Sequence, residues 1–151
     1  MGEGRRRAGF TLIEVTVILF LLAVAAAVAL PALSRGTDAL RVRTEVAGFC
    51  NFLRHAREQA VTRRETQQVE VDLQGHILVL RKSGSDSPTP SRRLWPALHV
   101  EPETPAALTV RFFPTGPASA AAYRIWGPGQ RVWLVTVDAL TGRVSNRLAE
   151  S

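Results

Sequence analysis

Apolar positions follow three different patterns along the chain, and each pattern predicts a different element. The first is a run over residues 15–34 that contains no charged side chain. A helix of this length measures about 30 Å at about 1.5 Å per residue, which is the hydrocarbon thickness of a bilayer. The run therefore predicts a helix that can span a membrane.

Glu14 lies at the start of this run and opposes insertion. Its carboxylate would cost about 2.5–3.5 kcal/mol at the bilayer centre and less near the end of a span, whereas the strongly apolar residues together favour insertion by about 5 kcal/mol. Insertion is therefore favoured. Two simple interpretations remain open, a plain membrane anchor and a cleaved secretory signal with residues 5–7 as its basic part and residues 25–29 at the cut.

The second pattern is a stripe of apolar residues at spacings of four and three: Val42, Val46, Phe49, Leu53, Ala56 and Ala60. This spacing predicts an amphipathic helix with one buried face. The opposite face carries Arg54, Arg57, Glu58 and Arg64, and we interpret it as a solvated face in preference to a nucleic-acid surface. Cys50, beside the stripe, is expected to be a half-buried, inert thiol.

The third pattern is a period of two that begins after Thr66 and predicts β-strands. Alternation up to Leu73, a turn at Gln74 and Gly75, and a return over residues 76–81 indicate a hairpin, whereas residues 82–93 are expected to form an exposed loop. Further strands are expected over residues 94–100, 108–113, 123–126, 132–138 and 143–148. The predicted fold class is α+β, a long N-terminal hydrophobic helix, with a membrane-spanning and an amphipathic part, packed on a mainly antiparallel β head.

Composition narrows the function classes. The length of 151 residues suits one domain, and one cysteine leaves no intramolecular disulfide. A net charge of +6 and a pI of about 11.1 keep nucleic acid or an anionic surface open as partners. His55, His76 and His99 have no cysteine or carboxylate at metal-ligand spacing, and the sequence contains no phosphate-binding glycine loop and no nucleophile elbow. We therefore expect no enzyme, no metal site and no cofactor.

Residues 7–14, Arg-Ala-Gly-Phe-Thr-Leu-Ile-Glu, lead directly into the apolar run and resemble the class III leader of type IV pilins. The resemblance implies that a prepilin peptidase cuts between Gly9 and Phe10 on the cytoplasmic side and methylates the new amine of Phe10. It also implies that Glu14 pairs with a neighbouring subunit's N-terminus and sets axial register, since a carboxylate in lipid needs a cationic partner. Pro31 would mark a bend in the helix.

Three looser motifs cover much of the remaining chain: residues 49–64, the Phe-Pro-Thr-Gly segment at 113–116 and the Thr-Gly-Arg-Val segment at 141–144. Together they resemble the GspH/FimT group of minor pilins and pseudopilins, although both glycine segments also fit ordinary turns at strand ends. The resemblance implies a leader over 1–9, a transmembrane and filament-core helix over 10–34, the amphipathic part of the spine helix over 35–66, and a periplasmic β-rich head over 67–151.

The function implied is that of an H-type minor pseudopilin of a type II secretion system, a structural subunit of the pseudopilus that helps export folded proteins. Its partners would be other pseudopilins, the prepilin peptidase, the inner-membrane assembly platform and the lipid bilayer. The protein would cross the inner membrane once, with its N-terminus in the cytoplasm and its head in the periplasm. This orientation follows from the resemblance, because arginines are equally frequent on the two sides of the span.

The alternative is a FimT-like minor type IV pilin involved in DNA uptake or pilus assembly, with Arg143 and Arg147 as DNA contacts. Ser145 stands where the tighter Gly-Arg-x-Arg pattern of that group has an arginine. Removal of the leader, which holds three arginines and one glutamate, would also lower the net charge from +6 to +4. Both observations favour secretion over DNA capture.

Overall fold

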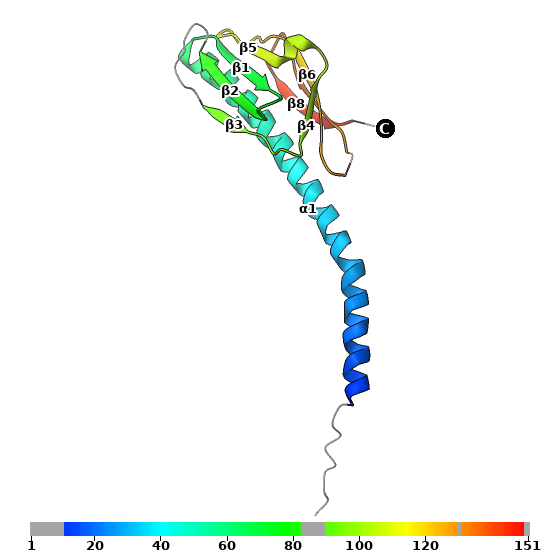
Figure 1. Cartoon of the computed structure of the whole chain (residues 1–151). Coiled ribbons are helices and arrows are strands. Elements are labelled where there is room, and N and C mark those ends of the chain that lie inside the picture. The colour runs from blue at the N-terminus through cyan, green and yellow to red at the C-terminus, as the bar shows by residue number, and fades with distance from the viewer. Residues whose placement is uncertain (1–10, 83–89, 130, 150–151) are drawn as a thin grey trace, which may run out of the picture. The chain divides into compact units, whose positions relative to one another are not determined.

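The computed structural model describes residues 11–82, 90–129 and 131–149, and it describes no side chains over residues 28–36. It divides into two units, Met1–Gly36 and Thr37–Ser151, which are considered in turn. One helix, α1 (Leu12–Arg63), contributes to both units (Figure 1).

In the first unit, α1 exposes large apolar side chains around its whole circumference. They are Leu12, Ile13, Val15, Val17, Ile18, Leu19, Phe20, Leu21, Leu22 and Val24. The second part of the predicted span, residues 28–34, lies outside the residues whose side chains are described. Among the described residues, no helix meets the length and apolarity that a membrane crossing requires.

In the second unit, α1 turns its apolar stripe into the core. All six predicted stripe residues, from Val42 to Ala60, are at most 3% exposed, which confirms the amphipathic pattern. Cys50 is 1% exposed and therefore more deeply buried than the expected half-buried thiol. It follows Phe49 directly, and both side chains point into the same core.

The predicted hairpin is confirmed as β1 (Gln67–Asp72) and β2 (Ile77–Lys82), which pair antiparallel with Val71 opposite Leu78. These strands lie at the centre of a first antiparallel sheet with the order β3-β2-β1-β5. Its outer strands are β3 (Ser91–Arg93) and β5 (Thr109–Phe112).

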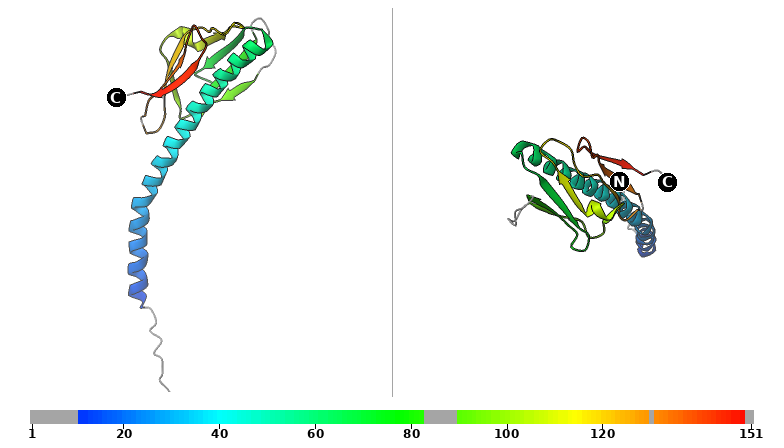
Figure 2. Two further views of the ribbon diagram at one scale, coloured as in Figure 1. Left: turned by 180° about the vertical axis from the view of Figure 1, so that it is seen from behind. Right: turned by 90° about the horizontal axis from the view of Figure 1, so that it is seen from above.

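A second antiparallel sheet has the order β4-β6-β7-β8. Its strands are β4 (His99–Pro102), β6 (Ala121–Trp126), β7 (Trp133–Val137) and β8 (Val144–Leu148). Strands β6, β7 and β8 correspond to the predicted strands over residues 123–126, 132–138 and 143–148. A short 3-10 helix, η1 (Pro105–Leu108), precedes β5 and was not expected from the sequence. In the second unit both sheets pack against α1, which runs past strand β3 of the first sheet and strand β8 of the second (Figure 2).

Two sequence predictions are wrong between strands β2 and β4, over residues 82–100. Residues 94–100 do not form one strand, because the chain turns where the Leu98 N–H donates to the Trp95 carbonyl, and Pro96 lacks the N–H that a strand ladder uses. The predicted loop over residues 82–93 ends instead in strand β3. The apolar residues that suggested a strand, Leu94 and Leu98, are buried in irregular backbone.

The core lies where α1 meets both sheets. The rings of Phe49 and Tyr123 meet edge to face, with centroids 5.1 Å apart, and both side chains are fully buried. The hydroxyl of Tyr123 donates to the carbonyl of Ala107 in η1, so the one polar atom of this ring has a partner. Burial raises the pKa of Tyr123, which keeps the phenol neutral and able to donate.

Candidate functional site

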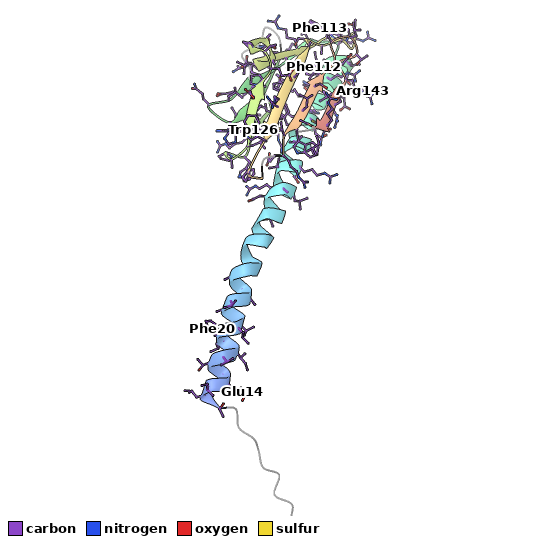
Figure 3. The ribbon with its side chains drawn as sticks, turned by 90° about the vertical axis from the view of Figure 1, so that its right-hand side faces the viewer. Glu14, Phe20, Phe112, Phe113, Trp126 and Arg143 are labelled. Atoms are coloured by element: carbon purple, nitrogen blue, oxygen red, sulfur yellow. The ribbon has the colours of Figure 1, made fainter. Side chains whose placement is uncertain are left out.

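The start of α1 carries the first candidate group, Glu14. Thr11 caps the helix, because its Oγ1 accepts from the Glu14 N–H at 3.3 Å. Glu14 thus lies in the first helical turn, where the helix dipole favours a negative charge. Its carboxylate is exposed beside a helix surface of apolar residues such as Phe20 (Figure 3).

The structure does not test the three other predicted functional residues of this segment. Gly9 and Phe10 lie outside the described residues, so the cleavage and methylation sites stay predictions. Pro31 lies within α1, but its side chain is outside the described set, and the predicted bend also stays a prediction.

In the head, the three loose sequence motifs come together around the turn between β7 and β8. Arg57 on α1 donates from Nε to the Thr141 carbonyl at 3.1 Å. Gly142 has a φ of +64° and lies so close to Gly116 that a Cβ on Gly142 would overlap the Gly116 carbonyl oxygen. The motif glycines therefore allow a close backbone approach in addition to making turns.

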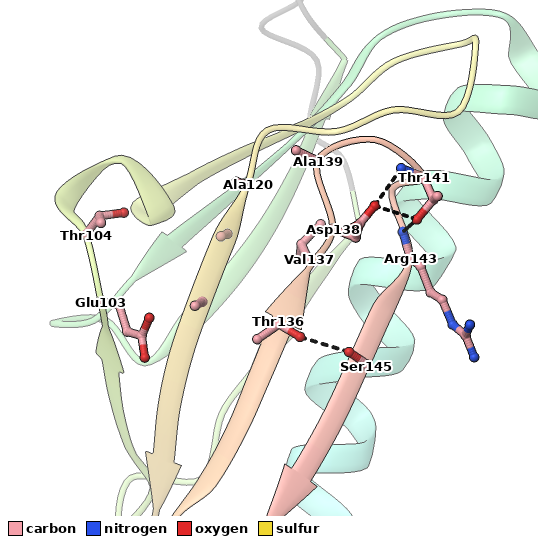
Figure 4. A pocket seen from close by; sticks show the side chains of 12 residues that line it. Glu103, Thr104, Ala120, Thr136, Val137, Asp138, Ala139, Thr141, Arg143 and Ser145 are labelled. Atoms are coloured by element: carbon pink, nitrogen blue, oxygen red, sulfur yellow. Dashed lines mark hydrogen bonds between the residues drawn. The ribbon is translucent and has the colours of Figure 1, made fainter. Parts of the chain in front are cut away.

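Asp138 holds the β7–β8 turn together (Figure 4). Its Oδ1 accepts from the Leu140 N–H at 3.1 Å, from the Thr141 N–H at 2.8 Å and from the Thr141 hydroxyl at 2.7 Å. The hydrogen bond from the Thr141 side chain lowers the pKa of Asp138 most, and the hydrogen bond from the Thr141 backbone adds to this effect. One carboxylate thus fixes the turn and places Arg143 directly before β8.

The turn borders a shallow depression on the face of the second sheet that points away from α1 (Figure 4). Its floor consists of small side chains from β6 and β7, among them Ala122 and Thr136, and Thr136 shares a 2.8 Å hydroxyl contact with Ser145. Glu103 and Arg143 stand at opposite sides of the depression. Among the described residues, no cluster of histidine, cysteine or carboxylate side chains is suited to a metal ion.

Both residues proposed as DNA contacts are exposed. Arg143 precedes β8 and Arg147 lies within it, four positions later, so the two side chains share one face of the strand. Figure 3 shows Arg143 at the surface of the head. The intervening residue on that face is Ser145, so the face carries two arginines and not three.

Sequence reasoning missed the role of two arginines on α1. Arg54 and Arg57 were interpreted as part of a solvated face, but Arg54 Nη2 donates to the Val144 carbonyl at 3.2 Å and Arg57 to that of Thr141. Their partners are 90 and 84 residues away in the chain, so helical spacing alone could not have identified them.

Buried Cys50 is not a reactive group. Burial raises the pKa of the thiol, and this effect outweighs the opposing charge of Arg54. The thiolate, the nucleophilic form, is therefore disfavoured at neutral pH.

A long N-terminal helix packed on two antiparallel sheets defines a pilin-like structural subunit and not an enzyme. The chain belongs to the family described as Type II transport protein GspH, whose model matches residues 45–141. A second family model, the prokaryotic N-terminal methylation motif, matches residues 4–30. A comparison with curated protein sequences finds no match.

Solved structures with the same fold come from two kinds of system. The type IV minor pilin FimU of Pseudomonas aeruginosa is 18% identical, with a TM-score of 0.59, over 72% of this chain and 98% of that chain. The minor pseudopilin EpsH from the type 2 secretion system of Vibrio cholerae is 20% identical, with a TM-score of 0.55, over 72% of this chain and 96% of that chain. At these identities the likeness establishes the pilin-like fold.

Proposed function

We propose that the protein is an H-type minor pseudopilin of a type II secretion system, a structural subunit of the pseudopilus that helps export folded proteins. The observation that carries this proposal is the GspH family match, which extends from the buried stripe of α1 to the β7–β8 turn. The leader motif and the exposed apolar surface of the first unit support the same role.

The exposed apolar residues of α1 need to be buried against lipid or another protein, because soluble proteins rarely expose so large an apolar surface. Before assembly they are buried in the lipid bilayer, with the head in the periplasm and the N-terminus in the cytoplasm. After assembly they are buried against the corresponding helices of other pseudopilins. Extraction from the bilayer requires the inner-membrane assembly platform.

Processing prepares the helix for assembly. The prepilin peptidase cuts after Gly9 and methylates the amine of Phe10. In the filament core this amine pairs with the Glu14 carboxylate of a neighbouring subunit, because a charge in apolar surroundings needs an opposite charge beside it. Pro31 bends the helix so that the apolar stretch follows the filament axis.

N-terminal sequencing of the protein from membranes tests the processing step. We expect a sequence that begins at N-methylated Phe10, and we expect Gly9→Leu to leave the full-length protein in the membrane. A mature protein that begins near Ala27 would identify a secretory signal and contradict the proposal.

Deletion of the gene in its host tests whether the protein serves a type II secretion system or a type IV pilus. The expected result is the loss of exoprotein secretion with unchanged DNA uptake and pilus display. The reverse result, normal secretion with impaired DNA uptake, would assign the protein to a type IV pilus.

A further inference from the structure

Strand β8 lies at the edge of the second sheet, and its backbone polar groups alternate between β7 and the open side. The Arg143 carbonyl accepts from the Asp138 N–H at 3.0 Å, and the Ala149 N–H donates to the Val132 carbonyl at 2.8 Å. In an antiparallel ladder every second residue bonds the same neighbour, so the odd-numbered residues of β8 bond β7. The N–H and C=O groups of Val144, Asn146 and Leu148 therefore point away from the sheet.

One of these outward groups has a partner in the chain. The Val144 carbonyl accepts from Arg54 Nη2 at 3.2 Å, which covers the edge at that end of the strand. Among the described residues, the outward backbone groups of Asn146 and Leu148 have no partner. The strand has no proline to protect this edge and carries a single charged residue, Arg147, and Leu148 is 47% exposed.

Beside this edge runs an open groove of about 590 Å³ between α1 and β8. Arg54 and Arg57 line it from α1, Arg143 lines it from the turn, and its floor is the strand itself at Val144 and Asn146. No carboxylate is among its lining residues. The groove is therefore positively charged along the open edge.

The two faces of β8 differ in chemistry. Arg143, Ser145 and Arg147 alternate onto the face that points away from α1, whereas Val144 and Leu148 lie on the other face. A strand added beside β8 would place alternate side chains next to these two sets. Opposite charges next to the arginines and an apolar side chain next to Leu148 would stabilise the pair.

We propose that the open edge of β8 and its arginine groove form a docking surface for an extended acidic segment of another filament subunit, which adds a strand to the second sheet. This inference rests on the proposed role as a filament subunit and specifies how the head contacts a partner. Main-chain hydrogen bonds would supply affinity, and the arginines would select an acidic segment with alternating apolar residues.

A protein strand fits this surface better than a nucleic acid does. Phosphates would satisfy the arginines but would leave the outward N–H and C=O groups of Asn146 and Leu148 without the alternating donors and acceptors that a strand presents. Nucleic-acid binding at the same arginines is accordingly a separate outcome of the test.

The probe is a short fluorescein-labelled peptide in which glutamate and valine alternate, added to the full-length protein in detergent micelles. We expect saturable binding by fluorescence anisotropy. In a second peptide, alternate backbone nitrogens are methylated. This peptide keeps its charges but loses the N–H groups that would donate to β8, and we expect it not to bind. This comparison requires no change to the protein.

Variants of the protein test the same edge. Asn146→Pro removes one outward N–H and is expected to weaken binding about fivefold or more, whereas the matched control Asn146→Thr keeps that N–H and binds within about twofold of the original. Replacing both Arg143 and Arg147 with Glu should weaken binding of the acidic peptide and favour a peptide of alternating lysine and valine, because main-chain hydrogen bonds supply the affinity and the arginines set the selectivity.

Equal binding of the methylated peptide, or no binding of the acidic peptide, would overturn strand addition. Competition by duplex DNA, with log affinity falling linearly with log salt, would assign the arginines to nucleic acid and also overturn it. Leader cleavage and secretion do not depend on this peptide measurement, so the proposed function can stand where the docking surface fails.

Discussion

Gly142 approaches Gly116 so closely that its missing side chain is a structural requirement. A Cβ on Gly142 would overlap the Gly116 carbonyl oxygen and would lie 3.0 Å from Arg57 Nε. The contact joins two turns that are distant in the chain and lies beside the Arg57–Thr141 hydrogen bond that holds the β7–β8 turn against α1.

Gly142→Ala should therefore destabilise the head by about 2–4 kcal/mol, from the positive φ together with the overlap. Gly129→Ala is the control for positive φ without an overlap, because Gly129 has a φ of +103°, which an alanine tolerates no better than +64°, and nothing lies within 4 Å of the added Cβ. We expect the control to cost about 1–2 kcal/mol in urea unfolding. Equal losses for the two variants would show that conformational strain alone decides and that the Gly116 contact is unimportant.

Gly48 in the middle of α1 accommodates the guanidinium of Arg92. A Cβ on Gly48 would overlap Arg92 Nη2, which contacts Glu45 Oε2 at 3.3 Å. Alanine should favour the helix by about 1 kcal/mol but displace Arg92. We expect Gly48→Ala to stabilise the protein in an Arg92→Ala background and to be close to neutral in the original protein.

A double-mutant cycle in urea measures this coupling between Gly48 and Arg92. Additive effects within about 0.3 kcal/mol would show that the guanidinium moves at no cost and that the fit of Arg92 over Gly48 does not contribute to stability.

The Asp138 turn predicts a pH dependence. Because hydrogen bonds from Thr141 hold the folded pKa of Asp138 below its unfolded value of about 3.9, the carboxylate stabilises the fold above about pH 4. This contribution is lost as the pH falls through the folded pKa. Asp138→Ala should lower the Tm at pH 7, and the difference from the original protein should shrink at acidic pH.

Asp138→Asn is the control for this effect, because it keeps the Oδ1 acceptor but not the charge, and it should give an intermediate Tm at pH 7. A Tm difference for Asp138→Ala that stays constant from neutral to acidic pH would show that the ionised form of Asp138 is not the source of stability.

Glu14 should matter for assembly and not for insertion. The Thr11 hydroxyl caps the helix through the Glu14 backbone, so Glu14→Gln keeps this hydrogen bond and loses only the charge. We expect Glu14→Gln to reach the membrane in normal amount but to be poorly incorporated into sheared filaments. Glu58→Gln changes an exposed glutamate on the second part of α1 and serves as the control.

The amounts of each variant in the membrane and filament fractions are compared on immunoblots. A Glu14→Gln protein that is lost from the membrane, or that enters filaments as well as Glu58→Gln does, would contradict the register role of Glu14.

Local patterns in the sequence predicted the elements whose burial repeats with a regular period. The stripe from Val42 to Ala60 predicted the buried face of α1, and alternation around Val69 and Leu80 predicted the first hairpin. Periodicity was misleading around Leu94, where apolar residues are buried without belonging to a strand. A buried residue in irregular backbone leaves no periodic signal, which explains this error.

The sequence by itself determined the apolar N-terminal helix, the amphipathic stripe, the pilin-type leader motif and most of the strands, because each depends on neighbours within a few positions. Only the tertiary structure decided that the strands separate into two sheets and that β8 forms an open edge. It also decided that Arg54 and Arg57 contact the β7–β8 region and that Gly142 meets Gly116. These relationships join residues far apart in the chain, and their partners are selected by packing, which no local pattern records.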